Sequence, residues 1–403
     1  MDKVIIVGGG ASGLVAGIFA ARAGKAVTIL EQKDRVGKKI LATGNGRCNY
    51  TNSHMELSCF NSENIDFVEK ALDRFSYQET INFFMNLGIY PKDIKGYTYP
   101  YSLQALSVVH VLELEALYLE VNIICNISVK QIKKSNDIFL VETDKKNYKA
   151  NKVILANGGC ASPNLGSDGS GYALAKKLGH KIIEPLPGLV QLVSDEKFTK
   201  MIAGIRTDAL INVYIDDELV SYQRGELQFT KYGVSGIVTL QISRFASKAL
   251  NSSKKVMLNI DLFPDMEWQD IIDLIENRIN NNPYKNMEEI FYGLFNNKLV
   301  LALLKRTNIS KDMKCNKLDK ANLIKLVDMI KNFNMNIVDT KDFSMAQVTV
   351  GGVDTSSVNP DTMESKIVKG LYFCGEILDV DGTCGGYNLQ WAWTSGYIAG
   401  KSV

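Results

Sequence analysis

The sequence predicts an α/β protein in which the two ends of the chain form one domain around a parallel sheet. The first thirty residues alternate a strand, a glycine-rich turn, a helix and a second strand. A strand, a glycine-rich turn and a helix follow one another again in residues 370–400. Between the two ends lie several short strands and then a mainly helical block. A chain of 403 residues is long enough for two or three such domains.

The N-terminal segment carries a dinucleotide-binding pattern in its full context. An apolar run at residues 4–7 precedes Gly8, Gly10 and Gly13, and small and apolar residues then follow as a helix. Gly8 suits a tight turn, Gly10 lets a pyrophosphate approach the backbone, and Gly13 lets the helix pack closely on the sheet. The helix N-terminus adds free N–H groups and the positive end of its dipole. The pattern therefore predicts a nucleotide bound at this turn.

A second strand at residues 27–30 ends at Glu31, 18 residues after Gly13. A carboxylate at this place accepts hydrogen bonds from a ribose 2′-OH, which suits an adenosine ribose without a 2′-phosphate. Two other interpretations are a βαβ unit without a ligand and a secretory signal. The many glycines make a poor hydrophobic region for a signal, and the motif is complete, so we favour nucleotide binding.

The composition indicates the partners and the compartment that we expect. Basic residues number 46 and acidic residues 44, so the net charge of +2 does not call for a nucleic acid or an anionic membrane. No stretch approaches 18 uncharged apolar residues, so we expect no membrane span. The seven cysteines form no C-x-x-C pair, which favours a reducing cytoplasm. The three histidines lack metal-ligand spacing, so we expect no metal, and the oligomeric state stays open.

The loop that follows the second strand is rich in glycine, asparagine and basic residues. Residues 43–52 read TGNGRCNYTN, shortly after the sequence Gly37-Lys38-Lys39. Backbone of this kind can lie against a long, flat, anionic cofactor, although a cluster of surface turns has a similar composition. We expect the following residues of this region to bind the cofactor: Gln32, Lys39, Thr43, Gly44, Gly46, Arg47 and Cys48.

The C-terminal segment looks like a second half of the same site. A buried strand at residues 370–374 ends in Gly375-Glu376, and a glycine-rich turn at 382–387 leads into the last helix. A strand that ends in glycine and an acid, followed by a helix N-terminus, can hold a second part of a nucleotide cofactor. A ligand that needs both ends of the chain must be long.

The middle of the chain divides into three patterns. Residues 121–150 read as a meander of short strands, and the strand at 153–156 leads into glycine-rich turns at 157–171 and a helix at 172–178. These turns lack G-x-G-x-x-G and a following strand with an acid, so we see no second dinucleotide domain for NAD(P)H. Further strands are expected at 189–194, 209–215, 218–223, 226–230, 254–261 and 333–350, and helices at 237–250, 268–279, 287–294, 298–304 and 320–330.

These blocks together resemble the flavoprotein family that includes aminoacetone oxidase and the bile-acid-pathway reductase BaiN. The resemblance covers essentially the whole chain, and residues 44–52 and 379–393 are its most specific parts. It implies an FAD-binding Rossmann domain of the glutathione-reductase type with an inserted β-barrel domain and a further inserted helical domain. The implied boundaries are 1–187 and 345–403 for the FAD domain, 188–262 and 331–344 for the barrel, and 263–330 for the helical domain.

The resemblance also implies a role for individual positions. The pyrophosphate would be held by Gly8, Gly10, Ala11, Ser12 and Gly13, and the adenosine ribose by Glu31. The adenine edge would lie at Val129, near Ala156, Asn157 and Gly158, and the ribityl and phosphate region at Gly375 and Glu376, near Asp381. The flavin pyrimidine would face Gly386, Asn388, Leu389 and Gln390. Two positions depart from the family pattern: Asn157 stands where we expect threonine, and Lys231 stands where we expect histidine.

We therefore expect an FAD-dependent oxidoreductase that acts on a small or mid-sized organic substrate, as a reductase that binds NADH or NADPH transiently. The hydride or electron chemistry belongs to the flavin, and the protein orients and tunes it. An amine oxidase of the aminoacetone type that uses O2 is the alternative within the family. A nucleic-acid-linked flavoprotein, such as a tRNA-modifying enzyme, or a flavin redox sensor is the alternative from another class.

The sequence does not define catalytic residues. Arg47 and Tyr387 could orient a substrate over the flavin ring, although each also suits a structural role. Cys48 has no second cysteine two to five residues away, so we do not expect thiol chemistry. Cys374 and Cys384 are expected to pack near the cofactor without pairing.

Overall fold

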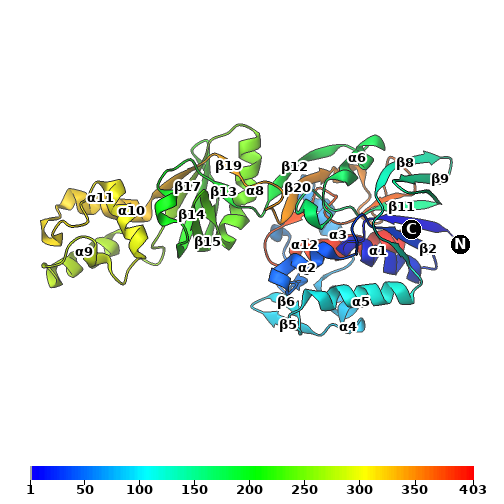
Figure 1. Ribbon diagram of the computed structural model, residues 1–403, viewed down its shortest axis with the longest axis horizontal. Coiled ribbons are helices and arrows are strands. Elements are labelled where there is room, and N and C mark those ends of the chain that lie inside the picture. The colour runs from blue at the N-terminus through cyan, green and yellow to red at the C-terminus, as the bar shows by residue number, and fades with distance from the viewer. Residues whose placement is uncertain (1) are drawn as a thin grey trace. The chain divides into compact units, whose positions relative to one another are not determined.

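The computed structural model describes residues 2–403, which divide into two compact units. The first unit combines the described residues up to 187 with residues 346–403, and the second contains residues 188–345. In Figure 1 the blue N-terminal segments and the red C-terminal helix belong to the same unit.

A five-stranded parallel sheet forms the centre of the first unit, and it confirms the parallel sheet that we predicted. Its strand order is β21-β11-β1-β2-β7, so a strand from the C-terminal segment pairs beside strands from the first half of the chain. The strands are short and mostly apolar, as in parallel sheets that are covered on both faces. Their bounds are β1 Lys3–Val7, β2 Ala26–Leu30, β7 Asn122–Ile124, β11 Lys152–Leu155 and β21 Leu371–Phe373.

The first and last helices, α1 (Ala11–Arg22) and α12 (Tyr387–Ser402), pack directly against each other. A Cβ added at Gly396 would lie 2.6 Å from the Ser12 carbonyl oxygen, and one at Gly400 would lie 2.4 Å from the Ala16 carbonyl oxygen. Only glycine permits such a close approach of two helix backbones. The packing brings the start of α12 into the same unit as the N-terminal glycine turn.

Smaller elements surround this sheet. Two antiparallel three-stranded sheets, β10-β9-β8 and β3-β6-β5, and the strand pairs β12-β20 and β22-β4 complete the first unit. The strands are β3 Thr51–Asn52, β4 Phe60–Asn61, β5 Pro91–Ile94, β6 Tyr97–Pro100, β8 Val129–Ser135, β9 Ile138–Thr143, β10 Asn147–Ala150, β12 Ile182–Gly188, β20 Val348–Val353 and β22 Asp381–Gly382. The helices are α2 Lys38–Ala42, α3 Ile65–Leu72, α4 Tyr77–Asn86, α5 Ala105–Tyr118 and α6 Ser170–Lys177, with 3-10 turns η1 Thr43–Gly46, η2 Leu57–Cys59, η3 Pro163–Leu165 and η6 Thr355–Ser357.

The second unit is built on a seven-stranded antiparallel sheet in the order β18-β17-β14-β15-β16-β13-β19. The two strands at the ends of this order are consecutive in the chain, because β18 and β19 are separated by Val338 alone. One extended segment therefore pairs with β17 and then with β13, so the sheet closes on itself. The strands are β13 Leu192–Val193, β14 Arg206–Ile215, β15 Glu218–Thr230, β16 Gly233–Ser235, β17 Val256–Asp261, β18 Phe333–Ile337 and β19 Asp339–Thr340.

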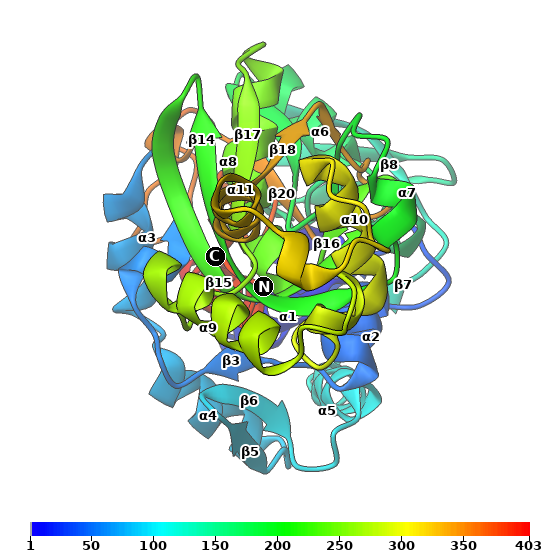
Figure 2. The same ribbon diagram turned by 90° about the vertical axis from the view of Figure 1, so that its left-hand side faces the viewer.

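Helices cover this sheet and share its core. Buried side chains of the sheet and of the helices form one continuous hydrophobic cluster, which includes Leu258, Phe333, Leu303 and Leu326. Figures 1 and 2 show α9, α10 and α11 grouped together at one end of this unit. The separation of a helical domain at 263–330 from the barrel stays a prediction. The helices are α7 Thr199–Ile202, α8 Ile237–Asn251, α9 Trp268–Asn281, α10 Asn297–Thr307 and α11 Lys320–Lys331, with 3-10 turns η4 Glu289–Phe291 and η5 Cys315–Lys317.

Several element boundaries differ from the sequence prediction. The strands expected at 218–223 and 226–230 are one strand, β15, because Gly225 stays paired with Ala209 across the ladder. The helix expected at 287–294 is only the short turn η4, which Tyr292 ends at an extended ψ of 127°. The strand expected at 333–350 is interrupted after Thr340 by a loop that precedes β20.

Candidate cofactor site

The three glycines of the N-terminal motif occupy three different environments. A Cβ at Gly8, where φ is +106°, would lie 2.4 Å from the Ala156 carbonyl oxygen, and one at Gly13 would lie 2.0 Å from the Gly8 carbonyl oxygen. A Cβ at Gly10 would meet nothing within 4 Å. Gly10 also caps the N-terminus of α1, whose first N–H groups lack intrahelical partners. The turn is therefore closed by packing at two glycines and open at the third, as a pyrophosphate cradle requires.

The Glu31 carboxylate lies at the end of β2 and is buried beside this turn. Its Oε2 accepts a hydrogen bond of 2.7 Å from the Gly9 N–H, and its Oε1 accepts one of 2.8 Å from the Lys33 N–H. Burial raises the pKa of this carboxyl, and the backbone N–H groups oppose that shift. Each oxygen keeps a second lone pair, so the carboxylate can still accept ribose hydroxyls.

The neighbours of Glu31 come from distant parts of the chain. The Ile127 N–H donates to the Glu31 carbonyl oxygen at 3.0 Å, which places the start of β8, Val129, two residues beyond this contact. The Gln32 amide donates to the Gly166 carbonyl oxygen at 2.6 Å. The structure thus gathers the residues expected for the ribose and the adenine edge.

The turn after β11 contains a buried polar atom without a partner. The Asn157 Oδ1 is buried and accepts no hydrogen bond among the described residues. Its Cα lies beside Gly8, and Gly158 lies beside the hydroxyl of Ser167. An unsatisfied buried acceptor costs roughly 1–3 kcal/mol, which a hydroxyl of a bound ligand would recover. The departure from the family threonine therefore leaves a polar group that suits a cofactor.

The C-terminal half-site meets the N-terminal one at Gly375. A Cβ here, where φ is +81°, would lie 2.3 Å from the Ser12 Oγ. Ser12 Oγ donates to the Cys374 carbonyl oxygen at 3.2 Å, and the Gly375 N–H donates to the Ser395 Oγ at 2.8 Å. The indole N–H of Trp391 donates to the Gly375 carbonyl oxygen at 3.2 Å. Side chains from both ends of the chain therefore hold this turn rigidly.

An ion pair joins the two half-sites a second time. Lys39 Nζ lies 2.6 Å from the Glu376 Oε2, and both side chains are about three-quarters buried or more. The other Glu376 oxygen accepts a hydrogen bond of 2.8 Å from the Thr349 N–H. The Thr349 Oγ1 in turn accepts the N–H groups of Cys160 and Ala161 at 2.7 and 3.0 Å. The sequence does not single out Thr349, because every residue of β20 is buried and no alternation distinguishes this threonine from its neighbours.

The loop that carries Lys39 lies against the glycine turn. The Gly37 N–H donates to the Gly9 carbonyl oxygen at 2.9 Å. Gly44 and Gly46 both have positive φ values, of 55° and 81°, and a Cβ at Gly46 would meet nothing within 4 Å. The Thr43 hydroxyl donates to the Ile40 carbonyl oxygen at 2.6 Å. Backbone on this side is therefore shaped by glycine and left open, as we expect for contact with a flat ligand.

The N-terminus of α12 begins at Gly386, where φ is +95°. A Cβ at this position would lie 2.7 Å from the Thr51 carbonyl oxygen and 3.0 Å from the Asn49 Oδ1. The Asn49 Oδ1 is another buried acceptor without a partner among the described residues. The N–H groups of the first turn, including those of Asn388 and Leu389, have no intrahelical acceptor. This end of the helix can stabilise negative charge on a bound ring.

Two side chains expected at the flavin are already engaged by the protein. The Asn388 amide bonds both backbone groups of Gly382, at 2.8 and 2.7 Å. Gln390 is fully buried, accepts from the Thr51 hydroxyl at 2.6 Å and donates to the Phe75 carbonyl oxygen at 3.1 Å. These side chains fix the loops around α12, so any contact of these positions with the ring runs through the backbone. Asp381 is buried nearby in β22, 3.3 Å from the Asn61 amide nitrogen.

The side chains of the two candidate catalytic residues, Arg47 and Tyr387, both contact other protein groups. The Tyr387 hydroxyl donates to the His54 carbonyl oxygen at 3.0 Å, and burial raises the pKa of this phenol. The Arg47 side chain is exposed, with its guanidinium 5.7 Å from the centre of the Tyr99 ring. The Tyr387 hydroxyl is thus bonded to the protein itself, and the catalytic role of either residue stays a prediction.

Tyr97 is a candidate that sequence reasoning missed. It lies on the same face of β6 as Tyr99, and a Cβ at Gly385 would lie 3.2 Å from its ring. The side chain is 36% exposed, and burial of the remainder raises the pKa of its phenol. A protonated hydroxyl at the start of α12 is therefore within reach of solvent. The alternation Tyr-Thr-Tyr in residues 97–99 is the signal that could have found it.

The thiols of this region are not expected to react as nucleophiles at neutral pH. Cys48 and Cys374 are fully buried, and burial raises the pKa of each thiol to about 12. Burial also raises the pKa of the Cys384 thiol to about 12. These thiols stay protonated at neutral pH, and none of the seven cysteines is in a disulfide in the described structure.

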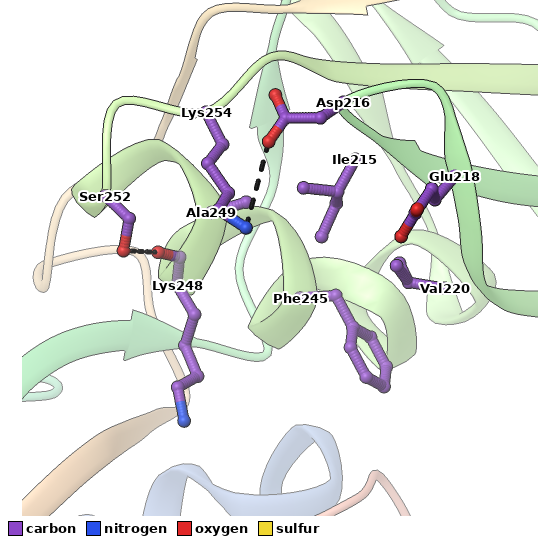
Figure 3. A pocket seen from close by; sticks show the side chains of 9 residues that line it. All are labelled: Ile215, Asp216, Glu218, Val220, Phe245, Lys248, Ala249, Ser252 and Lys254. Carbon is purple, nitrogen blue, oxygen red and sulfur yellow. Dashed lines mark hydrogen bonds and ion pairs between the residues drawn. The ribbon is translucent and has the colours of Figure 1, made fainter.

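The second unit has a hollow of its own, of about 550 Å³, at the β14–β15 turn and α8 (Figure 3). Its lining mixes apolar side chains with charged ones, and Lys254 Nζ lies 3.7 Å from an Asp216 oxygen. None of the residues expected to bind the cofactor lines it. Residues 2–403 contain no cluster of potential metal ligands and no helix long and apolar enough to cross a membrane.

Comparison with known families identifies the chain. The model of the HI0933-like protein Rossmann domain matches residues 2–402. The chain belongs to this family. The flavoprotein resemblance read from the sequence is thereby confirmed, and the open glycine turn, the buried Glu31 and the unpartnered acceptors fit FAD.

Three curated relatives match this chain over nearly its full length and over nearly their own. A 3-dehydro-bile acid delta(4,6)-reductase of Clostridium scindens is 45% identical over 406 residues, which cover 100% of this chain and 99% of the relative. A ribosomal RNA dihydrouridine synthase of Haemophilus influenzae is 31% identical and covers 99% and 98% of the two chains. The Escherichia coli protein of the same name is 28% identical, with 99% and 97% covered. The chain is a flavin-dependent oxidoreductase that acts on an organic substrate.

Proposed function

We propose that this protein reduces a carbon–carbon double bond conjugated to a carbonyl group, with NADH or NADPH as a transient donor. One observation carries the proposal: relatives with two different substrates share this chemistry. A 3-oxo-4,6-diene and the 5,6-double bond of uridine are both activated by a carbonyl in conjugation. The identity of 45% over the whole chain favours a steroid-like enone or dienone as the substrate.

The residues of the site suit this reaction in distinct ways. Bound FAD would supply the hydride. Gly10, Glu31 and Lys39 would anchor its adenosine and phosphate parts, and the N-terminus of α12 would stabilise negative charge on the ring. Reduction of an enone also needs a proton at the α-carbon, and the protonated Tyr97 hydroxyl beside Gly385 is our candidate donor.

A transient donor is consistent with the described structure. The described residues contain one five-stranded parallel sheet with one G-x-G-x-x-G turn. FAD would occupy this turn, so no second turn of this kind is left for NAD(P)H. NAD(P)H would therefore bind briefly to the loaded enzyme, give its hydride to the FAD and leave as NAD(P)+. We also propose a reducing compartment such as the cytoplasm, which the free cysteines support.

The experiment is anaerobic mixing of the FAD-loaded enzyme with a panel of donors. We expect NADH or NADPH to bleach the flavin absorbance, and a 3-oxo-4,6-diene steroid to restore it with formation of the reduced product. Aminoacetone is the matched control. Bleaching by aminoacetone, with peroxide release in air and no response to NADH or NADPH, would replace the reductase by the amine oxidase.

A second candidate substrate is uridine within ribosomal RNA. Two relatives at 31% and 28% identity carry this activity in their names, and residues 277–325 are strongly basic. Incubation of unmodified ribosomal RNA with enzyme and NADPH, followed by mass spectrometry of its nucleosides, tests this candidate. A gain of two mass units at one uridine supports it, and unchanged RNA beside an active steroid assay excludes it.

A further inference from the structure

The positive charge of the chain is concentrated in one part of the second unit. Residues 277–325 contain ten basic and four acidic side chains, a net charge of +6, whereas the whole chain has +2. The other 354 residues therefore carry a net negative charge. This segment spans the end of α9, the turns η4 and η5, α10 and the start of α11. A local excess of this size is an electrostatic footprint for a polyanion.

Part of this charge is gathered into a patch by backbone pairing. The Cys315 N–H donates to the Lys285 carbonyl oxygen at 3.0 Å, and the Glu288 N–H donates to the Lys311 carbonyl oxygen at 3.1 Å. Lys314 forms a bridge with Asn286, and the Lys317 N–H donates to the Lys314 carbonyl oxygen at 2.9 Å. We call Tyr284, Lys285, Lys311, Lys314 and Lys317 the lysine patch.

The acidic side chains near the patch do not neutralise it. Glu288 is mostly buried and lies 4.0 Å from Lys311 Nζ, and it also accepts a hydrogen bond from Asn297. The Glu289 carboxylate accepts the Asn286 N–H at 2.8 Å. Lys285, Lys314 and Lys317 have no carboxylate partner among the described residues, and the Lys314 ammonium donates to the Tyr284 carbonyl oxygen at 2.6 Å. The segment also contains the exposed Asp312 and Asp319, and the Asp319 carboxylate accepts hydrogen bonds from Asn322. At least three lysines of the patch are therefore without an ion pair among the described residues.

An exposed aromatic ring lies within the patch. The Tyr284 side chain is 68% exposed, and Lys285 Nζ lies 6.0 Å from the centre of its ring. This ring therefore contributes little to the hydrophobic core, and it lies beside ammonium groups that have no carboxylate partner. Lysines that contact phosphates, together with an aromatic ring on which a base can stack, form the usual combination for single-stranded nucleic acid.

We propose that the lysine patch binds the phosphate backbone of single-stranded RNA, with one base stacked on Tyr284. The inference deepens the second candidate function, on which it rests for the choice of RNA. The charge pattern itself is independent of the reaction. The patch would hold the RNA strand by its phosphates.

The test measures binding of a fluorescein-labelled 20-nucleotide oligouridylate to the FAD-loaded, full-length enzyme across a salt series. We compare the wild type with a variant in which Lys285, Lys311, Lys314 and Lys317 are changed to glutamine. The expected result is at least a tenfold loss of affinity and a salt slope that falls by roughly three, since each phosphate contact on a single strand contributes about 0.7. Flavin content and melting temperature report whether the variants are folded.

The matched control removes the same charge elsewhere. The variant changes Lys145, Lys149, Lys176 and Lys177, which are exposed in the first unit, to glutamine. It should bind the RNA as the wild type does. An equal loss in this control would mean that general attraction, and not the patch, binds the RNA.

Stacking is tested separately by Tyr284→Ala and Tyr284→Phe. The alanine variant should lose at least about fivefold in affinity, and the phenylalanine variant should keep it, because phenylalanine retains the ring. Vesicles with anionic lipids are the competing surface. Binding to such vesicles without binding to the oligouridylate would overturn the proposal, as would equal affinity of the wild type and the lysine-patch variant. Steroid reduction by all variants would still report on the proposed reductase.

Discussion

Individual glycines of the N-terminal turn have separable effects on folding and on cofactor binding. Gly10→Ala places its methyl group in open space at a φ of −79°, which alanine adopts readily. We expect the FAD-free variant to melt within about 2 °C of the wild type and to bind FAD at least about tenfold more weakly, since the methyl group would enter the pyrophosphate space. Thermal melting without FAD and fluorescence titration with FAD measure the two effects.

Gly13→Ala is the matched comparison at the same turn. Its methyl group would lie 2.0 Å from the Gly8 carbonyl oxygen, so the backbone must move. We expect a loss of about 1–3 kcal/mol in the free energy of unfolding even without FAD. If Gly10→Ala destabilised the FAD-free protein as strongly, the assignment of open space to Gly10 would be wrong.

The charge of Glu31 should oppose folding in the absence of the cofactor. Burial raises its pKa above the ordinary 4.5, so the folded protein binds this proton more tightly than the unfolded chain does. The stabilisation of the folded state by this tightly bound proton is fully present below pH 4.5, and it is lost as the pH rises through the raised pKa of Glu31. Glu31→Gln should remove this pH dependence and weaken FAD binding.

Melting curves of the FAD-free wild type and Glu31→Gln, compared from pH 4 to pH 7, measure the difference. The variant should gain in relative stability as the pH rises. A difference between the two proteins that stays constant over this range would show that Glu31 has an ordinary pKa.

Tyr97 should affect one half-reaction and not the other. Tyr97→Phe removes a hydroxyl that we propose as the proton donor, and a general acid contributes about 10²- to 10⁴-fold to a rate. We expect the oxidation of the reduced enzyme by an enone to slow by at least about 100-fold, with the reduction by NADPH unchanged. Tyr387→Phe, which loses a hydroxyl bonded to the His54 carbonyl oxygen and to Cys59, is the control. Equal slowing of both half-reactions would assign Tyr97 a structural role.

The sequence predicts which positions form the candidate site more readily than it predicts the contacts of their side chains. The motif positions Gly8, Gly10 and Gly13 could be read because each backbone requirement is local. The inward direction of Gln390 could not be read, because its partners Thr51 and Phe75 are more than 300 residues away in the chain. Thr349 was missed for the same reason, since its contacts are set by the fold of distant turns.

The packing of α1 on α12 gives a prediction at the scale of elements. Gly400→Ala would place a methyl group 2.4 Å from the Ala16 carbonyl oxygen and force the two helices apart. We expect a loss of about 1–3 kcal/mol by urea unfolding. Gly17→Ala is the control, because its methyl group would meet side chains and no backbone. It would lie 2.9 Å from the terminal carbon of Ile29, which can shift, and 3.6 Å from the nearest carbon of Ile6, and alanine gains about 1 kcal/mol in helix propensity. Equal losses of unfolding free energy in the two variants would mean that the backbones of α1 and α12 do not approach each other as closely as described.

The existence of most elements could be read from periodicity, but several boundaries could not. The parallel strands β1, β2 and β11 are apolar runs with clear glycine ends, so local pattern was sufficient. The shortening of β13 to two residues and the closure of the sheet through β18 and β19 depend on pairing between distant strands. No local pattern carries that information.

At the scale of the whole molecule, the two ends of the chain assemble the candidate cofactor site within one unit, and the central residues form a second unit. The contacts from Ser12 to Cys374 and from Lys39 to Glu376 join segments more than 300 residues apart. This arrangement explains why the nucleotide motif alone suggested only a dinucleotide, and why the C-terminal turn was needed to predict FAD.

The most direct measurement is anaerobic stopped-flow oxidation of the NADPH-reduced, FAD-loaded enzyme. A 3-oxo-4,6-diene steroid or a uridine-containing RNA is added as the acceptor, with the corresponding saturated compound as the control. The account predicts that the flavin absorbance returns with one conjugated acceptor, in proportion to the double bonds reduced, and does not return with its saturated counterpart. Recovery of the flavin only on admission of O2, with release of peroxide, would contradict it.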